Sequence, residues 1–305
     1  MRLLIIGASG FLGSHVRRQA SAAGLTVITA SRSALPGSPS HERLDLSADE
    51  AEGIAAVISS AAPDAVINCA GAVTGDPEVL AAANITGTHT LVMAMLRLGV
   101  PARLVHLGSA AEYGPSEPGV PVTESAPARP AGAYGLTKLA GTLLVDMART
   151  AGLDAVVLRV FNPVGRGAPE NGLPGSVAAQ LRRAQDDGTD VRLGPLDAVR
   201  DFVDARDVAD AALAAASAPA LPHTVLNVGS GVGVPVRTLV KELLAISGCH
   251  TAVHEDAAGS PRSASRAWQQ ADISRISRDL GWRPRRDLAA SLSDLWGVGD
   301  GRRTG

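Results

Sequence analysis

The sequence predicts an α/β fold in which a doubly wound parallel sheet is joined to a smaller C-terminal lobe. Three observations lead to this prediction. Short apolar runs alternate with helical segments, a glycine-rich turn follows the first of these runs, and proline and glycine become dense after residue 163. Alternating strands and helices favour a parallel sheet with right-handed crossover connections. With 305 residues, 46% of them hydrophobic, the chain is also long enough to bury a sizeable core.

Five short apolar runs are predicted to form the buried parallel strands of the sheet. Each is short, continuous and flanked by turn or helical residues, as expected for strands covered on both faces. They are Leu3–Ile6, Thr26–Thr29, Ala65–Ile67, Leu104–Leu107 and Ala155–Val160. Helices are expected between them, the first over His15–Ala23. Ligands of such sheets bind beyond the carboxyl ends of the strands, so residues that follow the strands are the first candidates for a site.

The second part of the fold is predicted from a change in composition. Proline and glycine are dense over Pro163–Pro174, which indicates that the chain leaves the first domain there. We therefore expect a dinucleotide-binding domain at 1–162, to which residues 197–228 return, and a substrate-binding lobe at 163–305. Within the later segment, a strand is predicted at Val225–Val228 and a helix at Val236–Ser247.

A glycine-rich turn after the first strand is a candidate phosphate site. Gly7 permits a tight turn, Gly10 lets backbone N–H groups approach a phosphate, and Gly13 lets the next helix pack closely on the strand. The turn lies between a predicted strand and a predicted helix, which favours a dinucleotide site over an ordinary turn. The expected cofactor-binding residues here are Gly7, Ser9, Gly10, Phe11, Leu12 and Gly13.

Tyr134 and Lys138 form a second pattern, because a spacing of four places both side chains on one face of a helix. An ammonium beside a phenol lowers a tyrosine pKa from its usual value of about 10. Ser109 follows the fourth strand. With the glycine turn, these residues resemble the extended short-chain dehydrogenase/reductase family, the NAD-dependent epimerase/dehydratase enzymes, over nearly the whole chain. The resemblance implies a Rossmann-type sheet and catalytic roles for Ser109, Tyr134 and Lys138.

The end of the second strand indicates which cofactor to expect. Dinucleotide sites for NAD usually place an acidic residue there to bind the ribose 2′-hydroxyl. This chain has Arg32 between two serines, and a guanidinium suits a 2′-phosphate, so we predict NADP. NAD stays possible if Arg32 is only a solvated loop residue. The resemblance implies further cofactor-binding residues: Asp45, Leu46, Ala70, Gly71, Asn84, Tyr134, Lys138 and Phe161. Asn84 could equally support the site through hydrogen bonds.

Two later segments, Leu158–Gly167 and Ala198–Val208, resemble the substrate-binding motifs of nucleotide-sugar enzymes in this family. The resemblance assigns Asn162 to the substrate, and Arg200 and Arg262 to its diphosphate. Two planar guanidinium groups can bind phosphate oxygens in pairs, which makes this assignment physically reasonable. The full set of expected substrate-binding residues is Ser109, Ala110, Glu112, Asn162, Arg166, Arg200 and Arg262.

Within the family, the chain most resembles GDP-4-keto-6-deoxy-mannose reductases. This implies NADPH-dependent reduction of the 4-keto group of an NDP-4-keto-6-deoxyhexose, a step of deoxysugar biosynthesis. One alternative is an NDP-sugar 4-epimerase with tightly bound NAD, because the Asn162-Pro163 pair resembles the sequences of such epimerases. The other is a ketoreductase for a non-sugar natural-product ketone. Ala110 and Ala111 disfavour a dehydratase, which often has an acidic residue just after the serine. The intact Ser109 and its partners disfavour a non-catalytic NADP sensor.

Composition and charge exclude several other classes. The net charge is −2 without a basic run, which argues against nucleic acid as a partner. No apolar stretch is expected to approach the roughly 20 residues of a membrane span, and no leader precedes the first strand, so a cytoplasmic location is expected. Two distant cysteines suggest neither a disulfide nor a metal site. The resemblance implies a homodimer formed through helices that begin near Asn84 and Tyr134, with Leu91–Leu98 and Leu139–Ala148 as candidate apolar faces.

Overall fold

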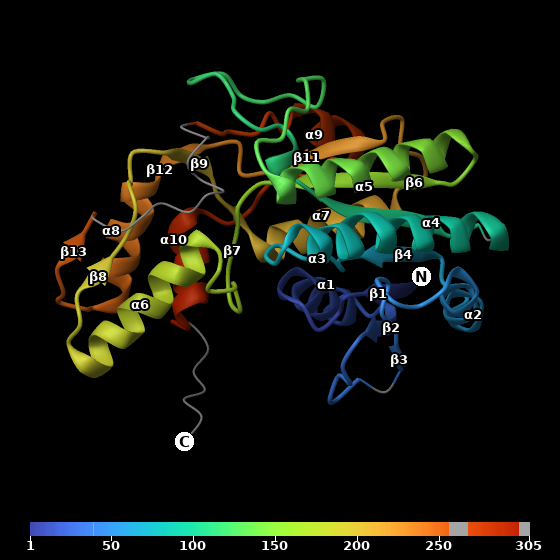
Figure 1. Ribbon diagram of the computed structural model, residues 1–305, viewed down its shortest axis with the longest axis horizontal. Coiled ribbons are helices and arrows are strands. Elements are labelled where there is room, and N and C mark those ends of the chain that lie inside the picture. Colours follow the sequence, from blue (N-terminus) through green and yellow to red (C-terminus); the bar gives the residue numbers. More distant parts are fainter. Residues whose placement is uncertain (39, 100, 256–267, 299–305) are drawn as a thin grey trace.

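The computed structural model describes residues 1–38, 40–99, 101–255 and 268–298, which form a large α/β part and a smaller lobe (Figure 1). The large part is a seven-stranded sheet in the order β11-β6-β5-β4-β1-β2-β3, and all of its strand pairs are parallel. This architecture confirms the predicted fold class. The strands are β1 (Arg2–Ile6), β2 (Thr26–Ser31), β3 (His41–Arg43), β4 (Ala65–Asn68), β5 (Arg103–Ser109), β6 (Ala155–Val160) and β11 (Val225–Val228).

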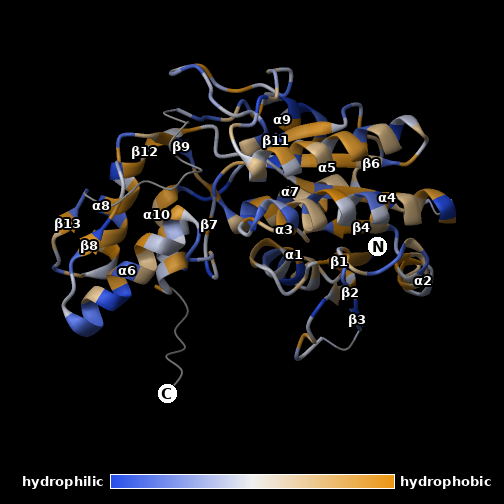
Figure 2. Cartoon of the chain, in the orientation of Figure 1, coloured by the Kyte–Doolittle hydropathy of each residue, from blue (hydrophilic) through white to orange (hydrophobic). Residues whose placement is uncertain are grey.

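Helices cover both faces of this sheet because the strand residues alternate between two cores. Leu3 and Ile5 of β1 belong to one core, and Leu4 and Ile6 belong to the other. The first core is closed by α1 (Phe11–Ala22), α7 (Ala205–Ser217) and α9 (Ser274–Leu280). The second is closed by α2 (Ala51–Ala61), α4 (Gly87–Leu98) and α5 (Ala133–Thr150). Figure 2 shows the hydrophobic residues gathered on the strands and on the helices that face them.

The helix before β5 contains a local irregularity. The helix α3 (Pro77–Ala81), a π-helical turn (Ala82–Thr86) and α4 form a continuous helix, Pro77–Leu98. With 22 residues, this helix is long and apolar enough to cross a membrane. The expectation that no apolar stretch approaches the length of a membrane span is therefore wrong. However, 44% of its apolar window is buried inside the protein. Its apolar composition is therefore explained by packing against the sheet and α5.

The smaller lobe is built around its own hydrophobic core. Three helices supply most of that core, and three two-stranded pairs connect them. The helices are α6 (Leu173–Asp187), α8 (Val236–Ser247) and α10 (Leu288–Trp296). The pairs are β7 (Pro163–Val164) with β10 (Val203–Asp204), β8 (Val191–Arg192) with β13 (Val253–His254), and β9 (Val199–Asp201) with β12 (Gly233–Pro235).

The boundary predicted between the two parts needs one correction. The segment 268–283 was expected in the lobe, yet Ile276 and Trp282 are buried in the core of the large part. The Trp282 indole also donates to the carbonyl of Asp207 at 3.1 Å. This segment therefore packs on α7 and β11 instead of on the lobe. A short polar strand at the opposite sheet edge, β3, was also not predicted because its sequence, His-Glu-Arg, carries no apolar run.

Candidate active site

The turn between β1 and α1 has the shape that its glycines predict. Gly7 has φ +77, and a Cβ atom on it would lie 2.7 Å from the backbone nitrogen of Ala70. A Cβ on Gly13 would lie 2.1 Å from the carbonyl oxygen of Gly7. No side chain of the described residues caps the first turn of α1. Its N–H groups, beginning near Phe11, are therefore available to bind an anionic group such as a dinucleotide pyrophosphate.

The segments that carry Ser109, Tyr134 and Lys138 meet at the carboxyl end of β5. Ser109 is the last residue of β5, and Tyr134 and Lys138 lie in the first two turns of α5, as predicted. The Lys138 ammonium donates to the carbonyl of Leu107, two residues before Ser109, at 2.6 Å. A Cβ on Gly135 would lie 2.5 Å from the carbonyl of Ala111, so the start of α5 abuts the turn that follows Ser109.

Two opposing effects act on the pKa of the Lys138 ammonium. Burial lowers the pKa of the Lys138 ammonium, and the nearby carboxylate of Glu112 acts in the other direction and raises it. Tyr134 lies four residues earlier on α5, so the two side chains share one face of the helix. A serine, a tyrosine and a lysine are side chains that can hydrogen-bond to and exchange protons with a bound oxygen.

The loop after β4 passes close to Lys138. A Cβ on Gly71 would lie 2.8 Å from Oδ1 of Asn84 and 3.8 Å from Nζ of Lys138. Asn84 is buried in the π-helical turn, and its Oδ1 accepts from the backbone N–H of Ala72 at 3.0 Å. Its amide nitrogen donates to the Ala72 carbonyl and to the Thr137 hydroxyl. Asn84 thus supports the loop through hydrogen bonds, and a direct contact with the cofactor stays a prediction.

The end of β2 carries the residues expected near the adenosine ribose. Arg32 is exposed, and the Ser31 hydroxyl donates to the Ser33 carbonyl at 2.8 Å. Arg43 of β3 pairs with Ser31 across the sheet edge, which brings a second guanidinium to this place. A hydrogen bond from Ser47 lowers the pKa of Asp45, and the charges of Arg32 and Arg43 lower it further.

The residues expected to bind the substrate differ in burial, and the environment of Glu112 contradicts its expected role. Glu112 is fully buried, and both of its carboxylate oxygens bind protein donors, so it has no position from which to contact a substrate. Ala110 is also buried, as is Phe161, which was expected to bind the cofactor. The Asn162 side chain, which is partly exposed, donates to the Asp201 carbonyl at 2.8 Å. Arg200 is buried on β9, and Arg262 lies outside the described residues.

The backbone of Arg166 contacts α1 and α10. Its carbonyl accepts from the ring of His15 on α1 at 2.8 Å, and its backbone N–H donates to Asp294 of α10 at 2.8 Å. A Cβ on the neighbouring Gly167 would lie 4.0 Å from the ring of Phe11. The backbone of Arg166 is therefore held between α1 and α10, and its contact with the substrate stays a prediction.

Comparison with known proteins identifies the family. Residues 3–229 match the sequence model of the NAD dependent epimerase/dehydratase family, which is most of the chain. The chain belongs to this family. It is 38% identical to dTDP-6-deoxy-L-talose 4-dehydrogenase (NAD(P)(+)) from Kitasatospora kifunensis, over 97% of this chain and 94% of that protein. It is 28% identical to GDP-6-deoxy-D-mannose reductase from Pseudomonas aeruginosa, over 96% of both chains.

The solved structures of the epimerase/dehydratase family agree with this assignment. The crystal structure of the Thermus thermophilus UDP-glucose 4-epimerase in complex with NAD matches with a TM-score of 0.86, at 26% identity and over 99% of both chains. The protein is therefore an NAD(P)-dependent enzyme in a family whose members modify nucleotide sugars. The resemblance inferred from the sequence, including the likeness to a 6-deoxy-mannose reductase, is confirmed.

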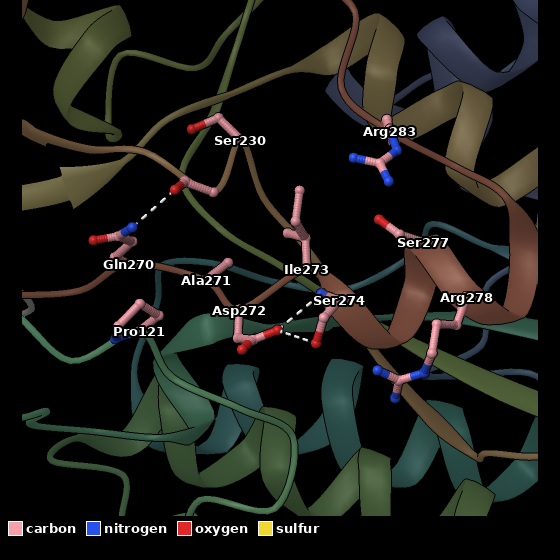
Figure 3. Close-up of a pocket in the computed structure, with 11 residues that line it drawn as sticks. Pro121, Ser230, Gln270, Ala271, Asp272, Ile273, Ser274, Ser277, Arg278 and Arg283 are labelled. Carbon is pink, nitrogen blue, oxygen red and sulfur yellow. Dashed lines mark hydrogen bonds between the residues drawn. The ribbon is translucent and has the colours of Figure 1, made fainter.

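A cavity of about 570 Å³ lies beside α9, apart from these residues (Figure 3). Its wall includes Asp272, which accepts from the backbone N–H of Ser274 at 2.8 Å, and Gln270, which donates to the Gly231 carbonyl. The cavity is also bordered by Arg278 and Arg283. None of the predicted site residues that the structure describes lines it. The cavity is therefore distinct from the site formed by the glycine turn and the Ser109 trio.

Proposed function

We propose that the protein is an NADPH-dependent reductase of the 4-keto group of an NDP-4-keto-6-deoxyhexose. The arrangement of Ser109, Tyr134 and Lys138 beside the glycine turn of β1 carries this proposal. The names of two relatives support it, because one is a 4-dehydrogenase and the other a reductase, and both are named for 6-deoxy sugar nucleotides. A bound nicotinamide cofactor would supply the hydride.

The protein's own residues would supply proton transfer and geometry. Tyr134 donates its proton to the oxygen of the carbonyl that is being reduced, and Ser109 donates a hydrogen bond to the same oxygen. Lys138 supplies positive charge next to the phenol, which favours the phenolate that this proton transfer leaves behind. The first turn of α1 offers its free N–H groups to the pyrophosphate of the cofactor.

The substrate diphosphate would bind to the lobe side of the site. Arg200 of β9 lies in the pair with β12, and Asn162 follows β6, so both come from segments beside the junction of the two parts. Arg200 and Arg262 are proposed to bind one diphosphate together. Their guanidinium groups can each form charge-assisted hydrogen bonds with its oxygens.

A 4-epimerase that holds NAD tightly is the second candidate, because the chain also resembles UDP-glucose 4-epimerases in sequence and fold. The two functions share the trio and differ in whether the cofactor turns over. The deciding experiment is to release and identify the cofactor from purified protein, and then to follow NADPH consumption with a panel of NDP-4-keto sugars. Stoichiometric NADPH oxidation supports the reductase. Tightly held NAD and interconversion of sugar epimers without net oxidation would support the epimerase.

The preference for NADPH is expected to depend on Arg32. Replacing Arg32 by Ala should weaken the binding of NADPH much more than the binding of NADH, because NADPH differs from NADH only by its 2′-phosphate. A hydrogen bond to a charged group contributes about 1.5–3 kcal/mol, which corresponds to about one to two decades of affinity. Fluorescence titration of both cofactors measures the effect, with the exposed Arg97→Ala of α4 as control. An equal loss of affinity for both cofactors would show that Arg32 does not bind the 2′-phosphate.

We also expect a homodimer that uses the outer face of α5. Leu136, Leu143 and Met147 lie on this face with 59%, 59% and 55% of their surface exposed. By contrast, Leu91 and Met95 of α4 are fully buried in the core, so the apolar face expected over Leu91–Leu98 points largely inward. Light scattering at micromolar concentration should give the mass of two chains, and Leu143→Glu should give one. A monomeric wild type would contradict this expectation.

A further inference from the structure

Glu112 is a buried carboxylate that contacts three different structural elements. Its side chain is 0% exposed. Oε1 accepts from the backbone N–H of Ser109 at 2.7 Å. Oε2 accepts from the hydroxyl of Thr142 on α5 at 2.8 Å and from Nε of Arg159 on β6 at 2.7 Å. One side chain therefore joins the end of β5, the middle of α5 and the neighbouring strand β6.

These contacts connect Ser109 with the helix that carries Tyr134 and Lys138. Tyr134, Lys138 and Thr142 are spaced by four residues, so they form one stripe along α5. Glu112 binds the last residue of this stripe through its Oε2 atom, and it binds Ser109 through its Oε1 atom. The distance between Ser109 and the stripe is thus spanned by a single carboxylate.

The partner of Glu112 is itself held firmly. The Arg159 guanidinium is largely buried and lies 4.6 Å from the centre of the Tyr113 ring, in a cation–π arrangement. The Tyr113 hydroxyl donates to Oδ1 of Asn227 on β11 at 2.6 Å. The ion pair is therefore anchored from the side of the sheet, so it can act as a fixed reference for Ser109 and α5.

We propose that Glu112 is a positioning residue that sets the relative placement of Ser109 and the Tyr134–Lys138 face of α5. The role rests on the proposed function of that trio, whichever sugar nucleotide is the substrate. Glu112 does not contact the substrate, because it is buried beneath the Ser109 turn. The capping-box pattern Ser-x-x-Glu, which begins at Ser109, fixes the first of these contacts, and the fold adds the other two.

The hydrogen-bonding chemistry of the three partners explains why a carboxylate is needed at position 112. The Ser109 N–H, the Thr142 O–H and the Arg159 Nε–H are all donors, and a carboxylate accepts from all of them. A glutamine of the same size has one acceptor oxygen and one NH₂ group. That NH₂ group would face a donor whichever way the amide turned, and the Arg159 charge would lose its counter-ion.

The first test is Glu112→Gln. We expect kcat to fall by about 10²-fold, the loss that a misplacement of about 1 Å can cause, while the KM for the sugar nucleotide and the Kd for NADPH change little. The variant is compared with wild type on the substrate that wild type turns over best. Thermal unfolding and NADPH binding report whether the protein is still folded.

A milder pair of variants serves if Glu112→Gln does not fold. Thr142→Val removes one hydrogen bond to the carboxylate and keeps the volume and the charges, so kcat should fall about tenfold. Thr142→Ser keeps the hydroxyl and should retain most of the wild-type kcat. This rescue separates the hydrogen bond from the packing of the side chain.

The matched control lies at the other end of the same strand. Arg103 begins β5 and is buried against Asp154, with a salt bridge of 2.8 Å. Asp154→Asn weakens this ion pair far from the trio, so it should lower the thermal unfolding temperature and leave kcat unchanged. The control shows how much activity is lost through stability alone.

The outcomes are distinct. A fall in kcat for Thr142→Val that Thr142→Ser restores, beyond any fall in the control, supports the proposal. Wild-type kcat in Thr142→Val, or an equal loss in Thr142→Ser, overturns it. If wild type reduces no NDP-4-keto sugar but epimerises a sugar nucleotide, the proposed reductase function fails, and the same ratios measured on that substrate still decide the role of Glu112.

Discussion

Tyr134→Phe is expected to keep its fold and its affinity for NADPH and to lose about 10²–10⁴-fold of its turnover, the usual contribution of a general acid. The substitution removes one hydroxyl from a half-buried position in the first turn of α5 and leaves the ring in place. Lys138 still reaches the Leu107 carbonyl, so the shape of the site is preserved. The loss should therefore appear in kcat and hardly at all in KM.

The measurement is steady-state NADPH oxidation with an NDP-4-keto sugar, together with circular dichroism and cofactor titration on the same preparation. Intact folding and cofactor binding with strongly reduced kcat is the expected combination. A rate close to that of wild type would show that another group, or a water molecule, donates the proton. In that event the proposed role of Tyr134 is wrong even if the substrate class is right.

Arg200→Ala is expected to raise the KM for the sugar nucleotide strongly while NADPH affinity stays near that of wild type. The loss of hydrogen bonds to a charged group costs about 1.5–3 kcal/mol, and the same holds for Arg262→Ala. The double variant should lose less binding free energy than the sum of the two single variants, because two residues that bind one diphosphate are coupled. A free 4-keto sugar without the nucleotide should be a poor substrate, since remote binding energy supports the chemical step.

Arg237→Ala is the control for this series, because Arg237 is an exposed lobe arginine that pairs with Glu255 and Asp197. It should leave the KM unchanged. The opposite pattern, in which Arg200→Ala and Arg262→Ala keep full activity and the enzyme reduces a neutral polycyclic ketone well, would point to a ketoreductase for non-sugar substrates. Substrate comparison and the arginine variants thus test the diphosphate assignment independently.

The sequence was sufficient for the parts of the site that depend on local pattern. The glycines after β1, the spacing of Tyr134 and Lys138, and the apolar runs of the central strands are all set within a few residues of one another, and the structure has them where they were predicted. Periodicity and turn chemistry are local properties, so a single sequence carries them.

The errors arise where the outcome depends on residues far apart in the chain. Glu112 was assigned to the substrate because it follows Ser109, but Thr142 and Arg159 draw it into the interior. For Asn84 and Arg166 the motifs gave only the expected roles, because their contacts with Ala72 and His15 depend on how the chain folds back. The Ser-x-x-Glu capping pattern was the one local signal for the role of Glu112.

The large sheet has a consequence for the protein during synthesis. Its strand β6 ends at Val160, but the strand that covers its outer edge is Val225–Val228, and the core on one face also requires Trp282. At about 5–20 residues per second, a ribosome needs roughly 3–14 s to go from Val160 to Val228, where the covering strand ends. During that interval the edge of β6 is an unpaired template to which other chains can attach. The nascent chain is therefore expected to depend on chaperones at this stage, and a gene truncated after residue 162 is expected to yield insoluble protein.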